Sequence, residues 1–222
     1  MLLKGNLHTH TTKSPCHKWD PSYQDTRKII EVYYKLKYDF LCLSDHNNWW
    51  DGIEDSTDKM KYKGEMTLII GNELSDCPLT KSHVIALRCP SVDEPEEILR
   101  ILAHPQEPYG LSVDEINEKL SDPKLKLDAV EITRKGKLKD EYVHAFIEGK
   151  FKKPVVVTDD AHKPSEIADA YILVDANENE PLPILRAIKA GKVFCAGFEY
   201  EKEYIRILAP EASGTGNKKR FT

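Results

Sequence analysis

The sequence lacks any run of about 18 apolar residues, the length that a helix needs to cross a bilayer. A cleavable signal peptide is not expected either. The first apolar stretch leads directly into His8 and His10, a pair that cleavage would remove. These absences predict a cytoplasmic protein that does not insert into membranes.

Cysteine is sparse and scattered. The five cysteines are odd in number and contain no CxxC pair, which argues against a disulfide framework and against a zinc ribbon. We expect Cys42 and Cys195 to be buried reduced thiols. The environment of Cys16, close to the two histidines, stays open at this point.

An excess of positive charge is also missing. The net charge is -5, so no general attraction to extended nucleic acid or to an anionic membrane is expected. The only concentrated basic run outside the C-terminal tail is residues 134–137, which begins with Arg134. A small phosphorylated molecule therefore fits better as a partner, and nothing in the sequence specifies the oligomeric state.

Strand-like and helix-like stretches alternate through most of the 222 residues. We expect a single domain over residues 1–213 and a flexible basic tail over residues 214–222. About seven or eight units of one strand and one helix can be distinguished. This number predicts an α/β fold with a mainly parallel sheet, closed or nearly closed into a barrel.

Individual elements follow from local signals. Asp20 and Pro21 are typical of the start of a helix, and Ser112 with Glu115 forms a capping box. The other expected helices cover residues 94–100, 140–148 and 183–190. The expected strands that follow the N-terminal one cover residues 40–43, 67–70, 84–87, 127–132, 155–157 and 171–174.

His8 and His10 are two residues apart behind the first apolar run. In a β-strand, residues i and i+2 point to the same face, so the two imidazoles would project together. Two neutral imidazoles on one face can chelate a metal ion. Taken alone, such a pair near an N-terminus is more often a chance occurrence than a site.

Further metal-binding side chains follow or flank the other expected strands, and only His144, inside an expected helix, falls outside the pattern. In a barrel of parallel strands, these ends meet at one face. One metal takes four to six ligands, so nine candidates indicate two or three metals that share a carboxylate. The candidates are His8, His10, His17, His46, Glu73, His83, His104, Asp160 and His162.

Most of these candidate residues belong to five short motifs. The motifs occur in the order found in the polymerase and histidinol phosphatase (PHP) family, which the sequence resembles. The helix end at Ile188 to Gly191 is similar to one near the end of the small PHP phosphoesterases. The resemblance implies a distorted (β/α)7 TIM-like barrel with a trinuclear metal site that hydrolyses phosphoesters. The motifs are His8-Thr9-His10, Asp45-His46, Gly71-x-Glu73, Ala103-His104-Pro105 and Asp160-x-His162.

The resemblance also implies a distribution of ligands. His8, His10, Glu73 and Asp160 would hold the first metal, and Glu73 would bridge to a second metal held by His83 and His104. His46 and His162 would hold the third, completed by His17, with Asp20 as an alternative. Asn6 stands where members of the family usually have Asp, and we expect it to orient a ligand histidine.

Clustered divalent cations lower the pKa of a bound water from 15.7 to about 7, so a metal-bound hydroxide could attack the phosphorus. Zinc, manganese and iron all suit these ligands. Arg134 could bind the substrate phosphate or be a solvated loop cation. Asp45 could orient a water or hydrogen-bond a ligand imidazole, and Glu131 has the same two alternatives.

The sequence therefore predicts a metal-dependent phosphoesterase that hydrolyses a small phosphorylated molecule. One alternative is a 3'-end nuclease on short single strands, which would need basic and aromatic residues along a groove. Another is a PHP domain that binds metal without catalysis.

Overall fold

The computed structural model describes most of the chain between residues 1 and 205. The described residues are 1–16, 18, 22, 25–50, 60–75, 80, 82–89, 98–106, 108–133, 140–168, 170–196, 198–200 and 203–205. The predicted tail at 214–222 lies outside them, so the domain boundaries 1–213 and 214–222 stay predictions.

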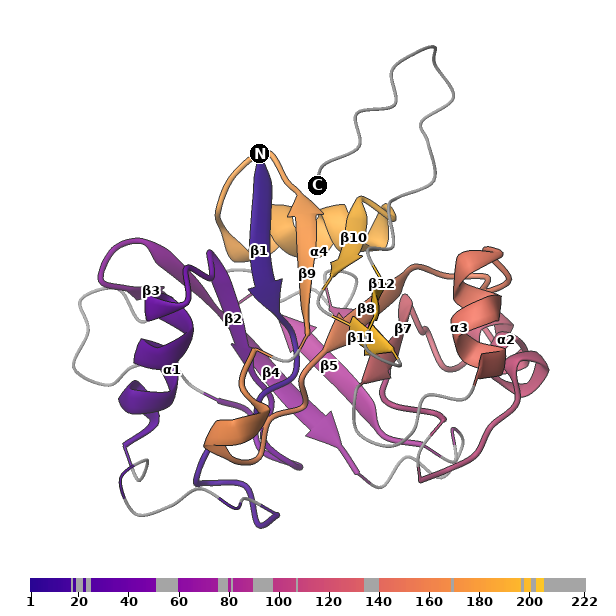
Figure 1. Ribbon diagram of the computed structural model, residues 1–222, viewed down its shortest axis with the longest axis horizontal. Coiled ribbons are helices and arrows are strands. Elements are labelled where there is room, and N and C mark those ends of the chain that lie inside the picture. Colours follow the sequence, from indigo (N-terminus) through magenta and orange to yellow (C-terminus); the bar gives the residue numbers. More distant parts are fainter. Residues whose placement is uncertain are drawn as a thin grey trace.

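Strands and helices alternate along the described chain, as the sequence indicates (Figure 1). The strands are β1 (Leu2–Asn6), β2 (Phe40–Leu43), β3 (Lys61–Tyr62), β4 (Met66–Leu74), β5 (Val84–Arg88), β6 (Leu99–Leu102), β7 (Ala129–Thr133), β8 (Val155–Thr158), β9 (Tyr171–Asp175), β10 (Val193–Ala196), β11 (Phe198–Tyr200) and β12 (Glu203–Ile205). The helices are α1 (Thr26–Lys35), α2 (Val113–Ser121), α3 (Asp140–Ile147) and α4 (Pro181–Lys189), with a 3-10 turn at Pro164–Glu166.

One sheet forms the centre of the molecule, in the order β10-β9-β1-β2-β4-β5-β6-β7-β8, with β3 on the side of β4. Its two end strands lie next to each other, because Cys195 Sγ in β10 is 3.3 Å from the Val155 carbonyl oxygen in β8. A parallel bridge between Thr9 and Ala161 also joins the segments that follow β1 and β8. The sheet is therefore a nearly closed barrel, and the predicted α/β barrel fold is confirmed.

The prediction of a mainly parallel sheet is wrong. The pairs β1–β2, β2–β4, β6–β7 and β7–β8 are parallel, but β4–β5, β5–β6, β1–β9 and β9–β10 are antiparallel. The chain reverses between Leu74 and Val84 and again between Arg88 and Leu99. Both connections are shorter than the roughly dozen residues of a parallel crossover, so these strands form hairpins.

Two of the predicted helix boundaries also change. The helix expected over 94–100 is wrong at its C-terminal end, where Leu99 and Arg100 begin β6, and residues 94–97 lie outside the described part. Helix α1 begins at Thr26, and Asp25 caps it by accepting a hydrogen bond from the Arg27 amide at 2.9 Å. The residues expected to start it, 20 and 21, are not described.

The capping box is confirmed. The Ser112 hydroxyl accepts from the Glu115 amide, and the Glu115 carboxylate accepts from the Ser112 amide at 2.8 Å. Both partners are satisfied locally, so α2 begins at the residue after Ser112.

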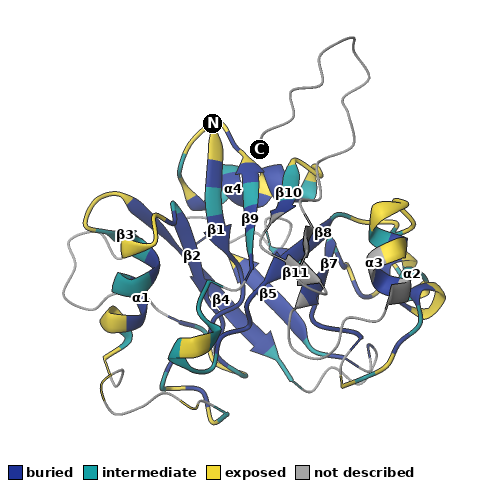
Figure 2. Ribbon diagram, viewed as in Figure 1, coloured by how far each residue is buried: buried dark blue, intermediate teal, exposed yellow. Residues whose placement is uncertain are grey.

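Buried apolar side chains fill the space between the sheet and the helices. Strands β2 and β8 are buried at every position, which explains the apolar runs Phe40–Leu43 and 155–157 (Figure 2). Helix α1 packs Ile29, Ile30 and Tyr33 against the β2 side, and α4 packs Ile184 and Ile188 into the larger part of the core. Figure 1 shows α1 and the α2–α3 pair on opposite flanks of the sheet.

Gly71 allows β2 and β4 to approach closely beside the polar end of the barrel. A Cβ atom at this position would lie 2.4 Å from Cys42 Sγ and 2.9 Å from the Leu43 carbonyl oxygen. Since Glu73 lies two residues further along β4, this close packing fixes where its carboxylate stands.

Candidate metal centre

Eight of the nine predicted metal ligands converge at one end of the barrel. His8 and His10 follow β1, His46 follows β2, His104 follows β6, and Asp160 and His162 follow β8. Glu73 lies near the end of β4, and His83 immediately precedes β5. His83 reaches this end because β5 runs antiparallel to β4, so the start of β5 meets the end of β4.

The Glu73 carboxylate occupies the middle of the cluster and is 1% exposed. Its Oε1 lies 2.6 Å from His83 Nδ1 and 2.9 Å from His104 Nε2. Its Oε2 lies 3.2 Å from His10 Nε2 and 3.1 Å from His46 Nδ1. Each oxygen therefore faces a different set of imidazoles, which is the arrangement that a bridging carboxylate needs.

Glu73 Oε2 is buried without a hydrogen bond, although ring nitrogens surround it. The nearby nitrogens are close enough for ion pairing but are not directed at this oxygen as hydrogen-bond donors. A buried carboxylate oxygen in this state is costly unless a cation compensates it. The residues present therefore fit a divalent metal on this side of Glu73.

His8, His10 and Asp160 form the second part of the cluster. The Nε2 atoms of the two histidines are 3.1 Å apart, and Asp160 Oδ1 lies 3.3 Å from His8 Nε2 and 3.1 Å from His10 Nε2. On the opposite edge of its ring, His8 Nδ1 donates to Glu131 Oε1 at 2.9 Å. This hydrogen bond leaves Nε2 as the metal-binding atom of His8.

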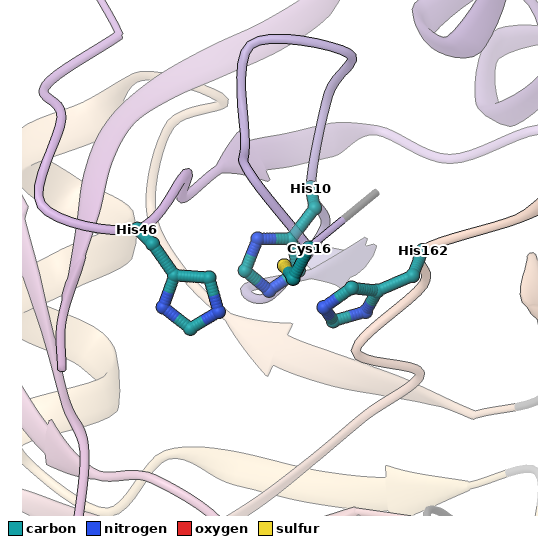
Figure 3. A group of neighbouring side chains, drawn as sticks. All are labelled: His10, Cys16, His46 and His162. Atoms are coloured by element: carbon teal, nitrogen blue, oxygen red, sulfur yellow. The ribbon is translucent and has the colours of Figure 1, made fainter. Parts of the chain in front are cut away.

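His10, Cys16, His46 and His162 form the third part. Each of them contributes one possible ligand atom, and these atoms lie within 4.8 Å of one another. Figure 3 shows the rings of His46 and His162 pointing toward each other on either side of His10 and Cys16. His162 Nδ1 donates to the Asp160 carbonyl oxygen at 2.9 Å, which leaves its Nε2 for a metal.

The imidazoles and carboxylates shift one another's pKa values. Burial alone would lower the pKa of His8, His10 and His104, but the neighbouring carboxylates outweigh it and raise the pKa of all three. Burial would raise the pKa of Glu73, yet the imidazoles lower it well below its usual range. Protons on the rings balance the carboxylates, and divalent cations would supply the same positive charge.

The pKa of His46 shifts in the opposite direction to those of His8, His10 and His104. Burial lowers its pKa to about 4, despite the opposing charge of Glu73. His46 is therefore neutral at physiological pH and keeps a lone pair for a metal.

Two of the converging residues have strained backbones. The φ angles of His104 and Asp160 are 27° and 45°, in the left-handed region that residues with a side chain rarely adopt. Such conformations cost of order 1–3 kcal/mol each and persist only where the surroundings impose them. The strain coincides with two residues that carry metal-binding groups.

The remaining predicted site residues are placed differently or not described. His17, Asp20 and Arg134 lie outside the described residues. Both oxygens of Asp45 accept from Thr11, Oδ1 from the amide and Oδ2 from the hydroxyl, each at 2.6 Å. Asp45 thus holds the loop after the histidine pair, which neither of its two sequence-based interpretations anticipated.

Sequence reasoning missed Cys16 and Tyr109 as neighbours of the cluster. Cys16 shares a short loop with His10, and that proximity was the available signal. The Tyr109 ring lies 5.5 Å from the His83 ring and 5.9 Å from the His104 ring, measured between centroids. Nothing in the spacing of Tyr109 from His104 distinguishes it from an ordinary turn residue.

Comparison with known proteins supports the resemblance found in the motifs. Residues 147–193 match the family model PHP_C, described as PHP-associated. No curated protein matches the chain in sequence. Several solved structures do match the chain in fold. Their sequence identities are too low to transfer a function from them to this chain.

Three of these structures illustrate the similarity. A two-domain protein of Bacteroides vulgatus ATCC 8482 contains a predicted PHP-like metal-dependent phosphoesterase. It has 16% sequence identity and a TM-score of 0.54, and the match covers 90% of this chain and 66% of that protein. The lesion-specific endonuclease PfuEndoQ of Pyrococcus furiosus has 18% identity and a TM-score of 0.60, and the match covers 89% of this chain and 59% of the endonuclease. PsfC of Pseudomonas syringae PB-5123 has 12% identity and a TM-score of 0.58, and the match covers 84% of this chain and 87% of PsfC.

The chain thus has the fold of PHP-like metal-dependent phosphoesterases, and the resemblance to the PHP family is confirmed. It spans less than two thirds of the length of the first two of these proteins. Among the described residues, none of the helices has the length and apolar character needed to span a membrane.

Proposed function

We propose that this protein is a metal-dependent phosphoesterase that hydrolyses a small phosphorylated molecule. The observation that carries the proposal is Glu73 Oε2, a buried oxygen without a hydrogen bond, 3.3, 3.2 and 3.1 Å from nitrogens of His8, His10 and His46. A carboxylate placed in this way is suited to bind cations, and a cationic centre of this kind is suited to phosphoester chemistry.

The predicted ligand sets can be assigned to the three parts of the cluster. His8, His10, Glu73 and Asp160 would hold one cation, Glu73 with His83 and His104 a second, and His46 with His162 a third. Zn²⁺, Mn²⁺ or Fe²⁺ bound there would neutralise charge on a phosphoryl group and lower the pKa of water to about 7.

Other groups of the chain set the geometry of these ligands. Glu131 fixes the tautomer of His8, and its second oxygen accepts from the His104 amide at 2.9 Å. One buried carboxylate therefore orients ligands from two strands. Arg134, which follows Thr133 in the sequence and lies outside the described residues, is proposed to bind the substrate phosphate, because a guanidinium matches phosphate bidentately.

The size of the substrate follows from charge. A net charge of -5 disfavours a long polyanion, whereas a small phosphate ester needs only the cations and one or two basic side chains.

The experiment is a hydrolysis screen with metal-loaded and chelator-treated protein. We expect phosphate release from p-nitrophenyl phosphate, from its bis ester or from a panel of metabolite phosphates, lost on chelation and restored by Zn²⁺, Mn²⁺ or Fe²⁺. Protein that binds two or three metal equivalents but hydrolyses none of these substrates would contradict the proposal.

A nuclease is the second candidate, because the fold is shared with the endonuclease of Pyrococcus furiosus. The same screen separates the two by including a short single-stranded oligonucleotide and a duplex with an abasic lesion. Cleavage of the oligonucleotides with no turnover of metabolite phosphates would favour the nuclease. The reverse pattern would favour the small-molecule phosphoesterase.

A further inference from the structure

We propose that Cys16 supplies a thiolate ligand to a metal held together with His46 and His162, so that this part of the centre prefers Zn²⁺. The inference rests on the proposed metal centre and specifies one of its sites. The resemblance suggested His17 or Asp20 for this position, and both of these residues lie outside the described part of the chain.

The geometry brings three separate segments to one point. Cys16 comes from the loop after β1, His46 from the end of β2, and His162 from the segment after β8. Their possible ligand atoms lie within 4.8 Å of one another. Metal binding would draw them together to the roughly 3.3–3.8 Å that separates the ligands of a tetrahedral zinc with bonds of about 2.0–2.3 Å. In Figure 3 Cys16 overlaps the ring of His10, with the ring of His46 on one side of the pair and that of His162 on the other.

Hydrogen-bond partners of His46 and His162 occupy one nitrogen of each ring and leave the other nitrogen to bind this metal. His46 Nδ1 is 2.6 Å from the Ser75 hydroxyl, and His162 Nδ1 donates to the Asp160 carbonyl oxygen. His46 Nδ1 also lies 3.1 Å from Glu73 Oε2. With the proton on Nδ1 in each ring, Nε2 is the nitrogen that can bind a metal. Partners of this kind on the far nitrogen are usual for histidines that bind metals.

The loop that carries Cys16 is held at both ends. At its start, Asp45 binds the amide and the hydroxyl of Thr11. At its end, the Lys18 amide donates to the His162 carbonyl oxygen at 2.8 Å. The fixed loop places Cys16 beside the same segment that provides His162, and this assigns Asp45 as a positioning residue.

His10 lies beside this group but is already used elsewhere. Its Nε2 is 3.1 Å from Asp160 Oδ1 and 3.2 Å from Glu73 Oε2. Among the described residues, the third site then has three donors of its own, Cys16, His46 and His162. Three protein donors with one open position are typical of catalytic zinc sites, whereas closed sites of four donors are structural.

The donor set determines the metal preference. A thiolate with two imidazoles selects Zn²⁺ over Mn²⁺, whereas the carboxylate between the other two sites accepts harder ions. When the metal binds, the Cys16 thiol gives its proton to the solvent and the sulfur bonds to the metal as a thiolate, so no oxidant or reductant is needed.

Cobalt(II) provides a direct test, because it occupies zinc sites and shows a thiolate-to-metal charge-transfer band in the near ultraviolet. The metal-free full chain is titrated with Co²⁺, and the wild type should develop this band. Cys16→Ser and Cys16→Asp should lack it, and Cys89→Ser, at the opposite end of β5 from His83, should keep it. A wild-type spectrum without the band would overturn the proposal.

Two further measurements test the Cys16 ligand without the cobalt absorption band. Elemental analysis should find one Zn²⁺ equivalent fewer in Cys16→Ser, while Cys16→Asp should regain an equivalent and accept Mn²⁺ there. Zinc should also slow iodoacetamide modification of Cys16 at least tenfold, measured by peptide mass spectrometry. Equal metal content in Cys16→Ser, or equal modification rates with and without zinc, would contradict the assignment.

These outcomes can be separated from those of the proposed function. A charge-transfer band without hydrolysis of any ester would support Cys16 and refute the phosphoesterase. Hydrolysis without the band would support the phosphoesterase and refute Cys16 as a ligand.

Discussion

Asn6 Nδ2 donates to Asp159 Oδ1 at 2.6 Å, and both side chains are buried. The other oxygen of Asp159 accepts from the Tyr33 hydroxyl at 2.7 Å and from the Ala168 amide at 3.0 Å. This network ties the end of β1 to the end of β8, the two strands that lead into His8 and Asp160. An amide at position 6 supplies a donor that a carboxylate lacks.

Asn6→Asp should therefore destabilise the protein. The change places a second carboxylate against Asp159 and removes the donor between them. We expect a loss of about 2–4 kcal/mol in the free energy of unfolding at pH 7.5, measured by denaturant titration of metal-free protein. Asn177→Asp, on an exposed loop, is the control, and equal stability of the two variants would refute the role of Asn6.

Asp159 should make stability depend on pH. Burial raises its pKa from 3.8 to about 7, although hydrogen bonds oppose the shift. The carboxyl ionises in the unfolded chain near pH 4 and in the folded chain near pH 7. Its contribution to the free energy of unfolding therefore falls as pH rises through this window, by about 4 kcal/mol at most.

The measurement compares metal-free wild type with Asp159→Asn at several pH values. The stability of the variant relative to wild type should increase between about pH 4 and pH 7 and then level off. Asp114→Asn, on the exposed start of α2, is the control. A stability difference that does not change over this range would count against a raised pKa.

Glu131→Gln should weaken metal binding without unfolding the barrel. Glu131 Oε1 accepts from His8 Nδ1 and from the Thr158 hydroxyl, so an amide disturbs the tautomer of His8. Replacing such a partner of a metal-bound histidine typically costs 10- to 100-fold in affinity, which competition with a chelator can measure. The control is Glu118→Gln, on the exposed face of α2. If the two variants bind metal with the same affinity, other contacts orient His8.

Gly71→Ala should cost about 1–3 kcal/mol in the free energy of unfolding, because the added methyl group would overlap Cys42 Sγ. Combining it with Cys42→Ala should recover part of the loss, because the shorter side chain removes that overlap. The recovery is partial since the Leu43 carbonyl oxygen stays 2.9 Å from the new Cβ. No recovery in the double variant, measured by denaturant unfolding, would place the strain elsewhere.

Much of the fold could be predicted because its signals are local. The apolar run before His46 and the capping box at Ser112 each depend on neighbouring residues alone. The direction of β5 could not be predicted in this way, because an apolar run has the same sequence pattern in either direction. Connection length between Leu74 and Val84 was the available signal, and it points to a hairpin.

The candidate site can also be divided into residues that the sequence could predict and residues that it could not. The histidines and Glu73 could be found from their positions at strand ends, since barrels gather those ends at one face. The roles of Cys16 and Asp45 depend on how the loop after His10 folds back toward His162. That path is set by long-range hydrogen bonds, such as the one between the Lys18 amide and the His162 carbonyl oxygen, which leave no local pattern.

The most direct test of the metal centre is the metal content of Glu73→Gln, compared with wild type and Glu118→Gln by elemental analysis after identical reconstitution. Glu73 faces two sets of imidazoles, so its neutral replacement should remove more than one metal equivalent. The Glu118→Gln control should keep them all. Full metal retention in Glu73→Gln would contradict a centre bridged by this carboxylate.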